Sequence, residues 1–323
     1  MKRVIIDTDP GIDDTAAIFF ALTSGVLQVD MLTTVFGNVE VEQTTRNALT
    51  ILETAGRADI PVFVGAGRPL IGEATFARRV HGNNGLGDIP LDPPGGHPGQ
   101  GRAAQRMVEA IMAAPGEITV IALGPLTNVA LALSIEPRIA RSVQQVIVMG
   151  GAVRTPGNVT SVASANLFND AESAAIVYSS GVPIVQVGLD VCRPTVITHA
   201  HLERLRGAGN PMSTLLMAVT PTLLEFYRQT YGQELGVHYN DVPAVAYAIA
   251  PGLFGSTRMP VLVETAGKLT RGQTVPDWHG QWGMEPNVEL CLEVDATRLA
   301  DQFTETVARG EVSKGTPVVA VVA

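Results

Sequence analysis

The sequence predicts an open α/β fold in which helices flank a mostly parallel central sheet. Apolar runs of strand length alternate with segments of helix length along most of the 323 residues. This alternation is typical of right-handed strand–helix–strand crossovers. With 46% hydrophobic residues, the chain can fill a large core. It has no internal repeat, low-complexity tract or linker-like segment, so a single domain over residues 1–323 is the simplest prediction.

The N-terminal part predicts the series strand, helix, strand, helix, strand. Residues 4–6 are apolar and begin a strand, Pro10-Gly11 forms a sharp turn, and residues 14–22 continue as a helix. The next strand, helix and strand are predicted at 29–37, 41–55 and 61–64. Because strands separated by helices pair in parallel, their carboxyl ends are expected at one edge of the sheet.

Two irregular stretches, residues 65–100 and 154–168, interrupt this alternation. The first is rich in Gly and Pro, and a loop of that length in a compact domain is usually functional or disordered. Between and after them, helices are predicted near 101–113, 126–134 and 170–179, and strands at 118–123, 145–149 and 183–187. The remainder is predicted as mostly helical over 199–250 with an interruption at 232–240, then as strands over 259–323 with one helix near 296–309.

The composition argues against several classes of partner. A net charge of −9 disfavours a nucleic acid or an acidic membrane surface. The N-terminus lacks the apolar run of a signal peptide, and no segment approaches the roughly 20 apolar residues of a membrane helix. The only cysteines, Cys192 and Cys291, lack the spacing of a metal or redox pair. A soluble cytoplasmic protein is expected.

Four carboxylates, Asp7, Asp9, Asp13 and Asp14, surround the first predicted turn. Carboxylates so close together raise one another's pKa and resist joint ionisation. The start of the helix can accommodate Asp13 or Asp14, but Asp7 and Asp9 precede the turn. A bound cation accounts better for the whole set. Because every evident ligand is an oxygen atom, Ca²⁺ or Mg²⁺ is favoured over Zn²⁺.

More polar residues are expected at the same edge of the sheet. They are Asn38, His81, Asn83, Asn128, Asn158, Asn166 and Asp241. Carboxylates together with amides suit a ligand with several hydroxyl groups, because an amide both donates and accepts hydrogen bonds. A sugar is the natural candidate. For an Asn beside Gly, such as Asn38, Asn83 or Asn158, a role in a turn is an equally good explanation.

The segment Asp7-Thr-Asp9-Pro-Gly-Ile-Asp13-Asp14 resembles the N-terminal signature of the inosine-uridine preferring nucleoside hydrolases. The resemblance extends over nearly the whole chain, through an ordered set of motifs. These are Gly37-Asn38, His81-Gly, Gly124-Pro-Leu-Thr-Asn128, Met149-Gly-Gly151, Gly157-Asn158-Val-Thr, Asn166-Leu-Phe168, Asp241 with Pro243-Ala-Val-Ala246, and Arg271-Gly-Gln-Thr274. The resemblance implies a Rossmann-like α/β fold and calcium-dependent hydrolysis of ribonucleosides to ribose and free base.

The resemblance also implies a role for each matching residue. The calcium ligands would be Asp9, Asp14, Asp241 and the backbone carbonyl of Leu123. Asp9 would also hold and deprotonate the attacking water. Asp13 and Asn166 would bind the ribose hydroxyls, and Asn38 and Asn158 would complete the sugar pocket. Because family members commonly form dimers or tetramers, a homodimer or homotetramer is expected.

Two residues depart from the family pattern. Asn240 takes the catalytic position of the histidine that is often assigned to protonating the leaving base, and Asn is not an acid near neutral pH. Ser164 replaces a glutamate that helps to bind the ribose 5′-hydroxyl. Candidates for activating the leaving base are His81, Tyr227, Tyr231 and His238, while Trp278 and Trp282 can either stack on a base or pack on the surface. The metal and ribose half is therefore expected to work as in the family, and base recognition to differ.

Two other functions remain open from the sequence. The substitutions at Asn240 and Ser164 allow a riboside-binding protein with weak or lost catalysis. Alternatively, Asp7 and Asp9 can be the nucleophile and acid of an aspartate-based phosphatase, although the chain has no convincing downstream phosphate-binding lysine. Steady turnover of a riboside would exclude the binding protein, and an acyl-phosphate trap would decide the phosphatase alternative.

Overall fold

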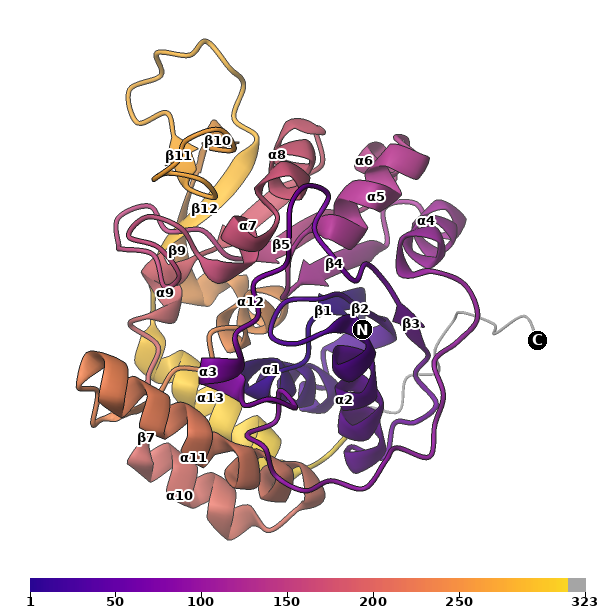
Figure 1. The fold of residues 1–323 in the computed structure, drawn as a ribbon, viewed down its shortest axis with the longest axis vertical. Helices are drawn as coiled ribbons and strands as arrows, with labels where there is room; N and C mark the ends of the chain where they lie inside the picture. The colour runs from indigo at the N-terminus through magenta and orange to yellow at the C-terminus, as the bar shows by residue number, and fades with distance from the viewer. Residues whose placement is uncertain (313–323) are drawn as a thin grey trace.

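The computed structural model describes residues 1–312, and its centre is an eight-stranded sheet with the strand order β3-β2-β1-β4-β5-β6-β12-β9 (Figure 1). The strands are β1 (Lys2–Thr8), β2 (Leu27–Thr34), β3 (Val62–Val64), β4 (Ile118–Ala122), β5 (Gln145–Met149), β6 (Ile184–Val187), β9 (Phe254–Met259) and β12 (Val288–Val294). All neighbours pair in parallel except β9, which is antiparallel to β12. The predicted open, mostly parallel α/β fold is confirmed.

Helices cover both faces of this sheet, as Figure 1 shows. They are α1 (Ile12–Thr23), α2 (Val41–Thr54), α3 (Arg78–His81), α4 (Ala103–Ala113), α5 (Thr127–Ile135), α6 (Ile139–Ser142), α7 (Ala165–Asn169), α8 (Ala171–Ser179), α9 (Leu189–Cys192), α10 (His199–Ala208), α11 (Pro211–Tyr231), α12 (Val242–Ile249), α13 (Ala296–Arg309) and the 3₁₀ turn η1 (Pro251–Leu253). In β1, Val4 and Ile6 belong to one apolar core and Ile5 to the other. This alternation is expected when both faces of a parallel sheet are covered.

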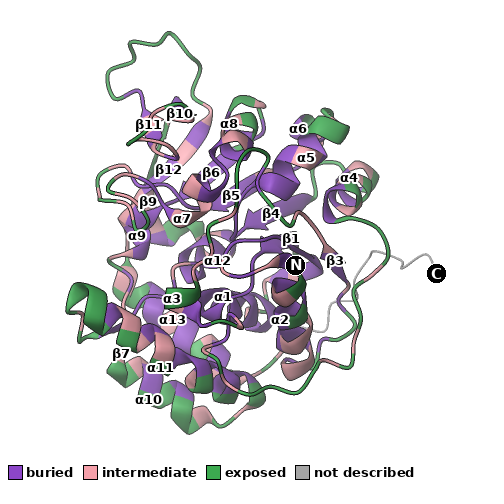
Figure 2. Ribbon diagram, viewed as in Figure 1, coloured by how far each residue is buried: buried purple, intermediate pink, exposed green. Residues whose placement is uncertain are grey.

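The two cores divide the helices between them. Helices α1, α2, α11, α12 and α13 contribute buried side chains to one core, and α4, α5 and α8 to the other. Figure 2 shows the consequence, with the sheet and its facing helix surfaces buried and the outer surfaces of α10 and α11 largely exposed. The β1–α1 turn is thus held from both sides by packed elements.

Most predicted elements are present, with boundaries shifted by a few residues. The irregular stretches contain two short helices, α3 and α7, that the sequence prediction missed, and α6 and α9 were missed as well. The predicted interruption at 232–240 contains β8 (Gly236–Val237), which pairs with β7 (Ile197–Thr198). The C-terminal prediction is confirmed by β12, α13 and the hairpin of β10 (Val261–Val263) and β11 (Thr274–Pro276). Its last residues, 313–323, lie outside the described residues.

The topology determines where a ligand can bind. Strand β1 lies between β2 and β4, so the chain leaves it toward one side of the sheet and later returns on the other. Such a change of direction opens a crevice at the carboxyl ends of the strands. Asp9 and Gly124 follow the ends of β1 and β4 at this crevice. Within residues 1–312, no helix has both the length and the apolar character needed to cross a membrane.

Candidate active site

A cavity of about 620 Å³ lies at the carboxyl ends of β1, β4 and β5. It brings together almost every side chain nominated from the sequence. Those that line it are Asp9, Asp13, Asn38, His81, Leu123, Asn158, Ser164, Asn166, Tyr227, Tyr231, His238, Asn240 and Asp241. Asp14, a predicted metal ligand, does not line the cavity, because it is fully buried behind this surface. Residues far apart in the sequence thus form one pocket.

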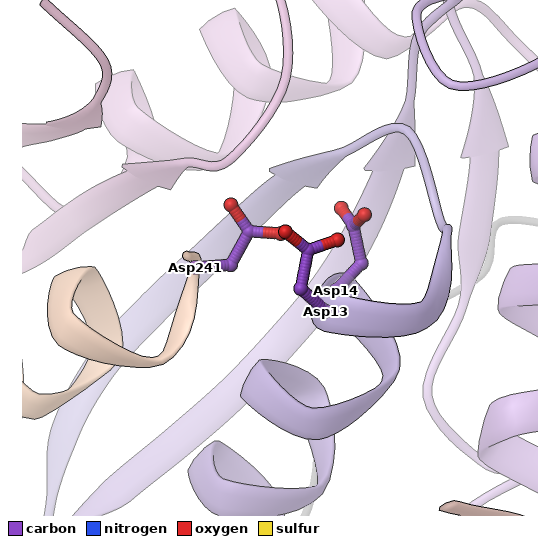
Figure 3. Close-up of side chains that lie close together, drawn as sticks. All are labelled: Asp13, Asp14 and Asp241. Atoms are coloured by element: carbon purple, nitrogen blue, oxygen red, sulfur yellow. The ribbon is translucent and has the colours of Figure 1, made fainter. Parts of the chain in front are cut away.

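Three carboxylates make up the floor of this pocket, with Asp13 and Asp241 at its surface and Asp14 buried directly behind them. One oxygen each from Asp13, Asp14 and Asp241 lies within 4.8 Å of the other two (Figure 3). Asp13 and Asp14 belong to the first turn of α1, where Asp14 Oδ2 accepts a hydrogen bond of 2.9 Å from the Gly11 N–H. Asp241 comes from the start of α12 on the other side of the floor. The described fold therefore creates a cluster of carboxylates whose charges are close and buried.

Burial is the main influence on these carboxyl groups. It raises the pKa of Asp13 to about 6 and that of Asp14 to about 6, with repulsion from Asp13 adding to the shift of Asp14. Burial and the neighbouring aspartates also hold the pKa of Asp9 and Asp241 well above the ordinary range. Among residues 1–312, no Lys or Arg forms an ion pair with any of the four.

The donor chemistry of the floor fits a hard cation. Asp13 Oδ1 is buried and has no hydrogen-bond partner, although an unpaired buried carboxylate oxygen is costly. His81 Nδ1 is 3.8 Å from this atom, but burial lowers the pKa of His81 to about 4, so the imidazole is neutral at pH 7. A divalent cation with oxygen ligands would compensate the clustered charge.

Asp9 occupies a narrow slot beside this cluster. Its Oδ2 accepts a hydrogen bond of 2.8 Å from the Asn38 N–H. A Cβ atom placed at Gly37 would lie 2.0 Å from Asp9 Oδ2, and one placed at Gly124 would lie 2.6 Å from Asp9 Oδ1. Both positions therefore require glycine. Asp9 is outside the cluster of three in the structure, so its assignment as a metal ligand remains a prediction.

Side-chain amides of Asn38 and Asn166 form hydrogen bonds at the pocket, Asn38 with the aspartates and Asn166 with the strand ends. The Asn38 side-chain amide donates to Asp14 Oδ2 at 2.9 Å and to the Asp9 carbonyl at 3.0 Å. The Asn166 amide donates to the carbonyls of Leu123 and Met149, which follow β4 and end β5. Leu123 and Asn166 are thus brought together at the pocket. Asn38 supports the carboxylates in addition to lining the cavity.

The two other predicted sugar residues support the loop before α7. Asn158 Oδ1 accepts from the Ala165 N–H at 2.9 Å, and Ser164 Oγ accepts from the Gly151 N–H at 2.8 Å. Their oxygens therefore have structural partners. The amide nitrogen of Asn158 and the hydroxyl proton of Ser164 are the groups with which these residues can donate to a ligand.

Tyrosine and histidine side chains form the wall opposite the floor. The Tyr227 hydroxyl oxygen accepts a hydrogen bond of 3.1 Å from the Asn240 amide, and burial raises the pKa of Tyr227, so the phenol stays protonated. His81 Nδ1 accepts from the Ile12 N–H at 3.2 Å. The neutral ring therefore carries its proton on Nε2. Tyr231 is half exposed.

His238 packs edge-on against Tyr227, with their ring centroids 4.9 Å apart. His238 Nδ1 lies 3.0 Å from the Thr195 carbonyl oxygen. Because a carbonyl oxygen only accepts hydrogen bonds, the proton of the neutral imidazole is on Nδ1. Burial lowers the pKa of this histidine as well. His238 therefore supports the position of the Tyr227 ring and has one ring nitrogen committed to the backbone.

Several residues that line the cavity were not predicted from the sequence, among them Phe76, Arg79, Arg193 and Phe226. An aromatic residue in a loop gives no periodic signal, although Phe226 could have been found because it precedes Tyr227 on the same helix. Trp278 and Trp282 are absent from the cavity lining within the described chain, and both are exposed on the segment after β11 that projects from the body of the protein (Figure 1). For these two, the surface alternative is the one observed.

Asp7, Asn83 and Asn128, which were also expected near the ligand, have structural roles. Asp7 is fully buried, and its Oδ1 accepts from Thr33 at 2.7 Å and from Asn128 at 2.8 Å. Asn83 hydrogen-bonds with the Asp88 carboxylate in its own turn. None of these three lines the cavity. The turn explanation for Asn83 is therefore confirmed.

Comparison with known proteins gives a consistent result. The family model described as inosine-uridine preferring nucleoside hydrolase matches residues 4–301. A probable uridine nucleosidase 2 from Arabidopsis thaliana is 38% identical over 304 residues, covering 91% of this chain and 94% of that protein. The pyrimidine-specific ribonucleoside hydrolase RihA of Salmonella gallinarum is 37% identical over 302 residues, covering 94% and 97%.

A solved structure shows the same likeness in three dimensions. The plant nucleoside hydrolase PpNRh1 superposes with a TM-score of 0.91 at 37% identity, covering 95% of this chain and 99% of that one. The match extends over the sheet, the helices and the pocket-bearing strand ends, and it does not support the phosphatase alternative. The chain belongs to the inosine-uridine preferring nucleoside hydrolase family.

Proposed function

We propose that this ribonucleoside hydrolase uses a calcium ion, with Asp9 as the base for the attacking water. The observation that supports the proposal most strongly is the buried cluster of Asp13, Asp14 and Asp241, with which no Lys or Arg of residues 1–312 forms an ion pair. Calcium prefers several carboxylate and carbonyl oxygens. Asp9, Asp14, Asp241 and the Leu123 carbonyl would hold it, and the position of Asp13 in the cluster makes that residue a further neighbour of the ion.

When bound, calcium would supply a Lewis acid and a template for the ribose hydroxyl groups. Asp13 and Asn166 would hold the 2′- and 3′-hydroxyls beside it, which orients C1′ for attack. Asp9 would take a proton from water as the water oxygen bonds to C1′. The C1′–N bond breaks and its electrons leave with the base. Positive charge that develops on the sugar is stabilised by the nearby carboxylates.

Neutral donors, rather than an ionised acid, would stabilise the leaving base. The Asn240 amide donates to the Tyr227 oxygen, so the phenol proton remains available for a base oxygen or nitrogen. His81 offers its Nε2–H in the same way, because its Nδ1 accepts from the backbone. Asn240 thus acts through Tyr227 and would itself transfer no proton. Tyr231 and His238 would complete the base-binding wall.

The relatives suggest the class of base. The two relatives described above are named as a uridine nucleosidase and as a pyrimidine-specific ribonucleoside hydrolase. We therefore propose uridine-type ribosides as preferred substrates. A wall of neutral hydrogen-bond donors suits the carbonyl oxygens of a pyrimidine.

The remaining expectations rest on the family resemblance and the composition. They are a single domain, a homodimer or homotetramer, and a cytoplasmic location. Both cysteines are free and buried, which is compatible with a reducing compartment. Light scattering of the purified protein would determine the oligomeric state.

A reducing-sugar assay tests the proposed function directly. The purified protein would be depleted of metal with a chelator, reconstituted with Ca²⁺, and tested on uridine, cytidine, inosine and p-nitrophenyl riboside. We expect turnover of uridine that is lost on chelation and restored by Ca²⁺. Full activity after metal removal would contradict the metal proposal. Riboside binding by calorimetry without turnover on any substrate would instead favour the binding-protein alternative.

A further inference from the structure

Helix α7 carries two pocket-lining asparagines, Asn166 and Asn169. Residues three positions apart lie on the same side of a helix. Asn166 reaches the strand ends through the carbonyls of Leu123 and Met149. Asn169 instead bonds to the loop that precedes α3. One short helix therefore contacts both the strand ends beside the floor of the pocket and a separate part of its wall.

The contact between Asn169 and this loop uses both backbone groups of one residue. The Thr75 N–H donates to Asn169 Oδ1 at 2.8 Å, and Asn169 Nδ2 donates to the Thr75 carbonyl at 2.7 Å. Asn169 is buried, whereas Thr75 is exposed. Only a side-chain amide can provide such a donor and acceptor pair side by side. We call this pair of hydrogen bonds the Asn169–Thr75 clasp.

The clasp fixes an aromatic part of the pocket wall. Phe76 follows Thr75 directly and lines the cavity, as does Phe168, which precedes Asn169. On the other side of Phe76, the Ala77 N–H donates to the Asn38 carbonyl at 3.0 Å. Phe76 is therefore held between the clasp and a residue that also supports Asp9 and Asp14. The arrangement couples the position of the aromatic wall to that of the floor.

The adjacent residue provides a second attachment of the same loop. Asp170 Oδ2 accepts a hydrogen bond of 3.0 Å from the Leu70 N–H and another of 2.6 Å from Thr127 Oγ1. Asp170 also caps α8 through the Ser173 N–H. Because this second attachment is anchored in two other elements, the loop stays tethered at Leu70 when the clasp is removed. Loss of Asn169 thus loosens the Phe76 segment specifically.

We propose that Asn169 is a positioning residue for riboside binding, which acts by holding the Phe76 wall at a set distance from the sugar-binding amide of Asn166. The inference rests on the proposed function for the identity of the ligand. The clasp restrains the wall segment, so less loop entropy is lost when a riboside binds than without it. The effect is on affinity, and the reacting atoms are untouched. Asn169 should therefore influence KM much more than kcat.

The test is steady-state kinetics of Asn169→Ala on the calcium-loaded protein, with uridine and with p-nitrophenyl riboside. We expect KM to rise about tenfold for both substrates, corresponding to about 1.4 kcal/mol, while kcat stays within about twofold. Asn169→Asp is a nearly isosteric second variant that keeps the acceptor but loses the donor, and its KM should rise in the same direction. Glu73→Ala changes the same exposed loop without touching the clasp and should leave both constants unchanged.

Hydrogen–deuterium exchange gives an independent readout. The peptide covering residues 70–77 should exchange faster in Asn169→Ala than in the parent protein and in Glu73→Ala, and peptides from the central sheet should not, which distinguishes loss of the clasp from a general loss of stability. Unchanged exchange would overturn the clasp, and faster exchange with unchanged KM would overturn its role in binding. The exchange result does not depend on turnover, so failure of the clasp is distinguishable from failure of the proposed hydrolase activity.

Discussion

The floor and the wall of the pocket differ in how firmly the fold holds them. Floor carboxylates come from the β1–α1 turn and α12, are almost fully buried, and are tied to backbone groups and to Asn38. The wall comes from α3 and the end of α11, and Tyr231 there is 50% exposed. The floor is thus firmly held by the fold, whereas the exposed end of the wall at Tyr231 is less constrained.

The largest effect that would test this difference is expected at Asp9. Asp9→Asn keeps the side-chain size, so the slot between Gly37 and Gly124 stays filled, but the amide cannot accept the proton from water. We expect kcat for uridine to fall by about 10² to 10⁴, measured by release of reducing sugar. Glu109→Gln, on α4 and away from the cavity, is the matched control. A loss below about tenfold would mean that another group is the base.

A second, intermediate effect is expected on the stability of the metal-depleted protein, which should depend on pH because the buried carboxyl groups have raised pKa values. Burial raises the pKa of Asp7 to about 7 and those of Asp13 and Asp14 to about 6. These groups retain protons in the folded state at pH values where the unfolded chain has released them. Their contribution to stability is therefore present below about pH 4 and is lost as the pH rises through about 6 to 7.

The metal-depleted protein should accordingly melt at a lower temperature at pH 8 than at pH 6.5. His81, whose pKa is lowered to about 4, opposes this trend only below its ordinary pKa of about 6.5. Each group contributes a slope of up to about 1.4 kcal/mol per pH unit. Calcium should raise the melting temperature most at pH 8, so that the melting temperature depends less on pH when the ion is bound. Differential scanning calorimetry with and without Ca²⁺ measures the melting temperature at pH 6.5 and at pH 8. Equal melting temperatures at the two pH values in chelator would refute the buried-charge explanation.

The smallest of the three effects should come from the wall. Tyr227→Phe removes the phenol that Asn240 supports, while leaving the ring to pack against His238. We expect kcat for uridine to fall about tenfold, the size of one lost hydrogen bond.

The same variant should hydrolyse p-nitrophenyl riboside within about twofold of the parent rate, since that leaving group needs no donor. The ratio of the rates on uridine and on p-nitrophenyl riboside therefore shows whether the variant has lost activation of the leaving base or catalysis at the sugar. An equal loss on both substrates would show that Tyr227 acts on the sugar side and that the division between floor and wall is incorrect.

The same division explains what could be predicted from the sequence. Asp13 and Asp14 stand together in a motif on a strand–turn–helix, so their clustering follows from local geometry. Asp241 is distant in the sequence; the strand order predicts it at the same edge of the sheet, but its role beside Asp13 and Asp14 came only from the family resemblance. Phe76 lies in an irregular segment, and α7 has five residues, too few to show helical periodicity. Their positions depend on side-chain contacts such as the Asn169–Thr75 clasp, which no pattern in the sequence reports.

The carboxylate cluster joins the beginning of the chain to a residue more than 200 positions later. Asp13 and Asp14 leave the ribosome early in synthesis, but the cluster of three cannot form until Asp241 has emerged and α12 has packed against α1. A divalent ion that requires all three would bind only after most of the sheet is assembled. Metal acquisition would then follow the assembly of most of the sheet, and truncated chains that stop before α12 would not retain the ion.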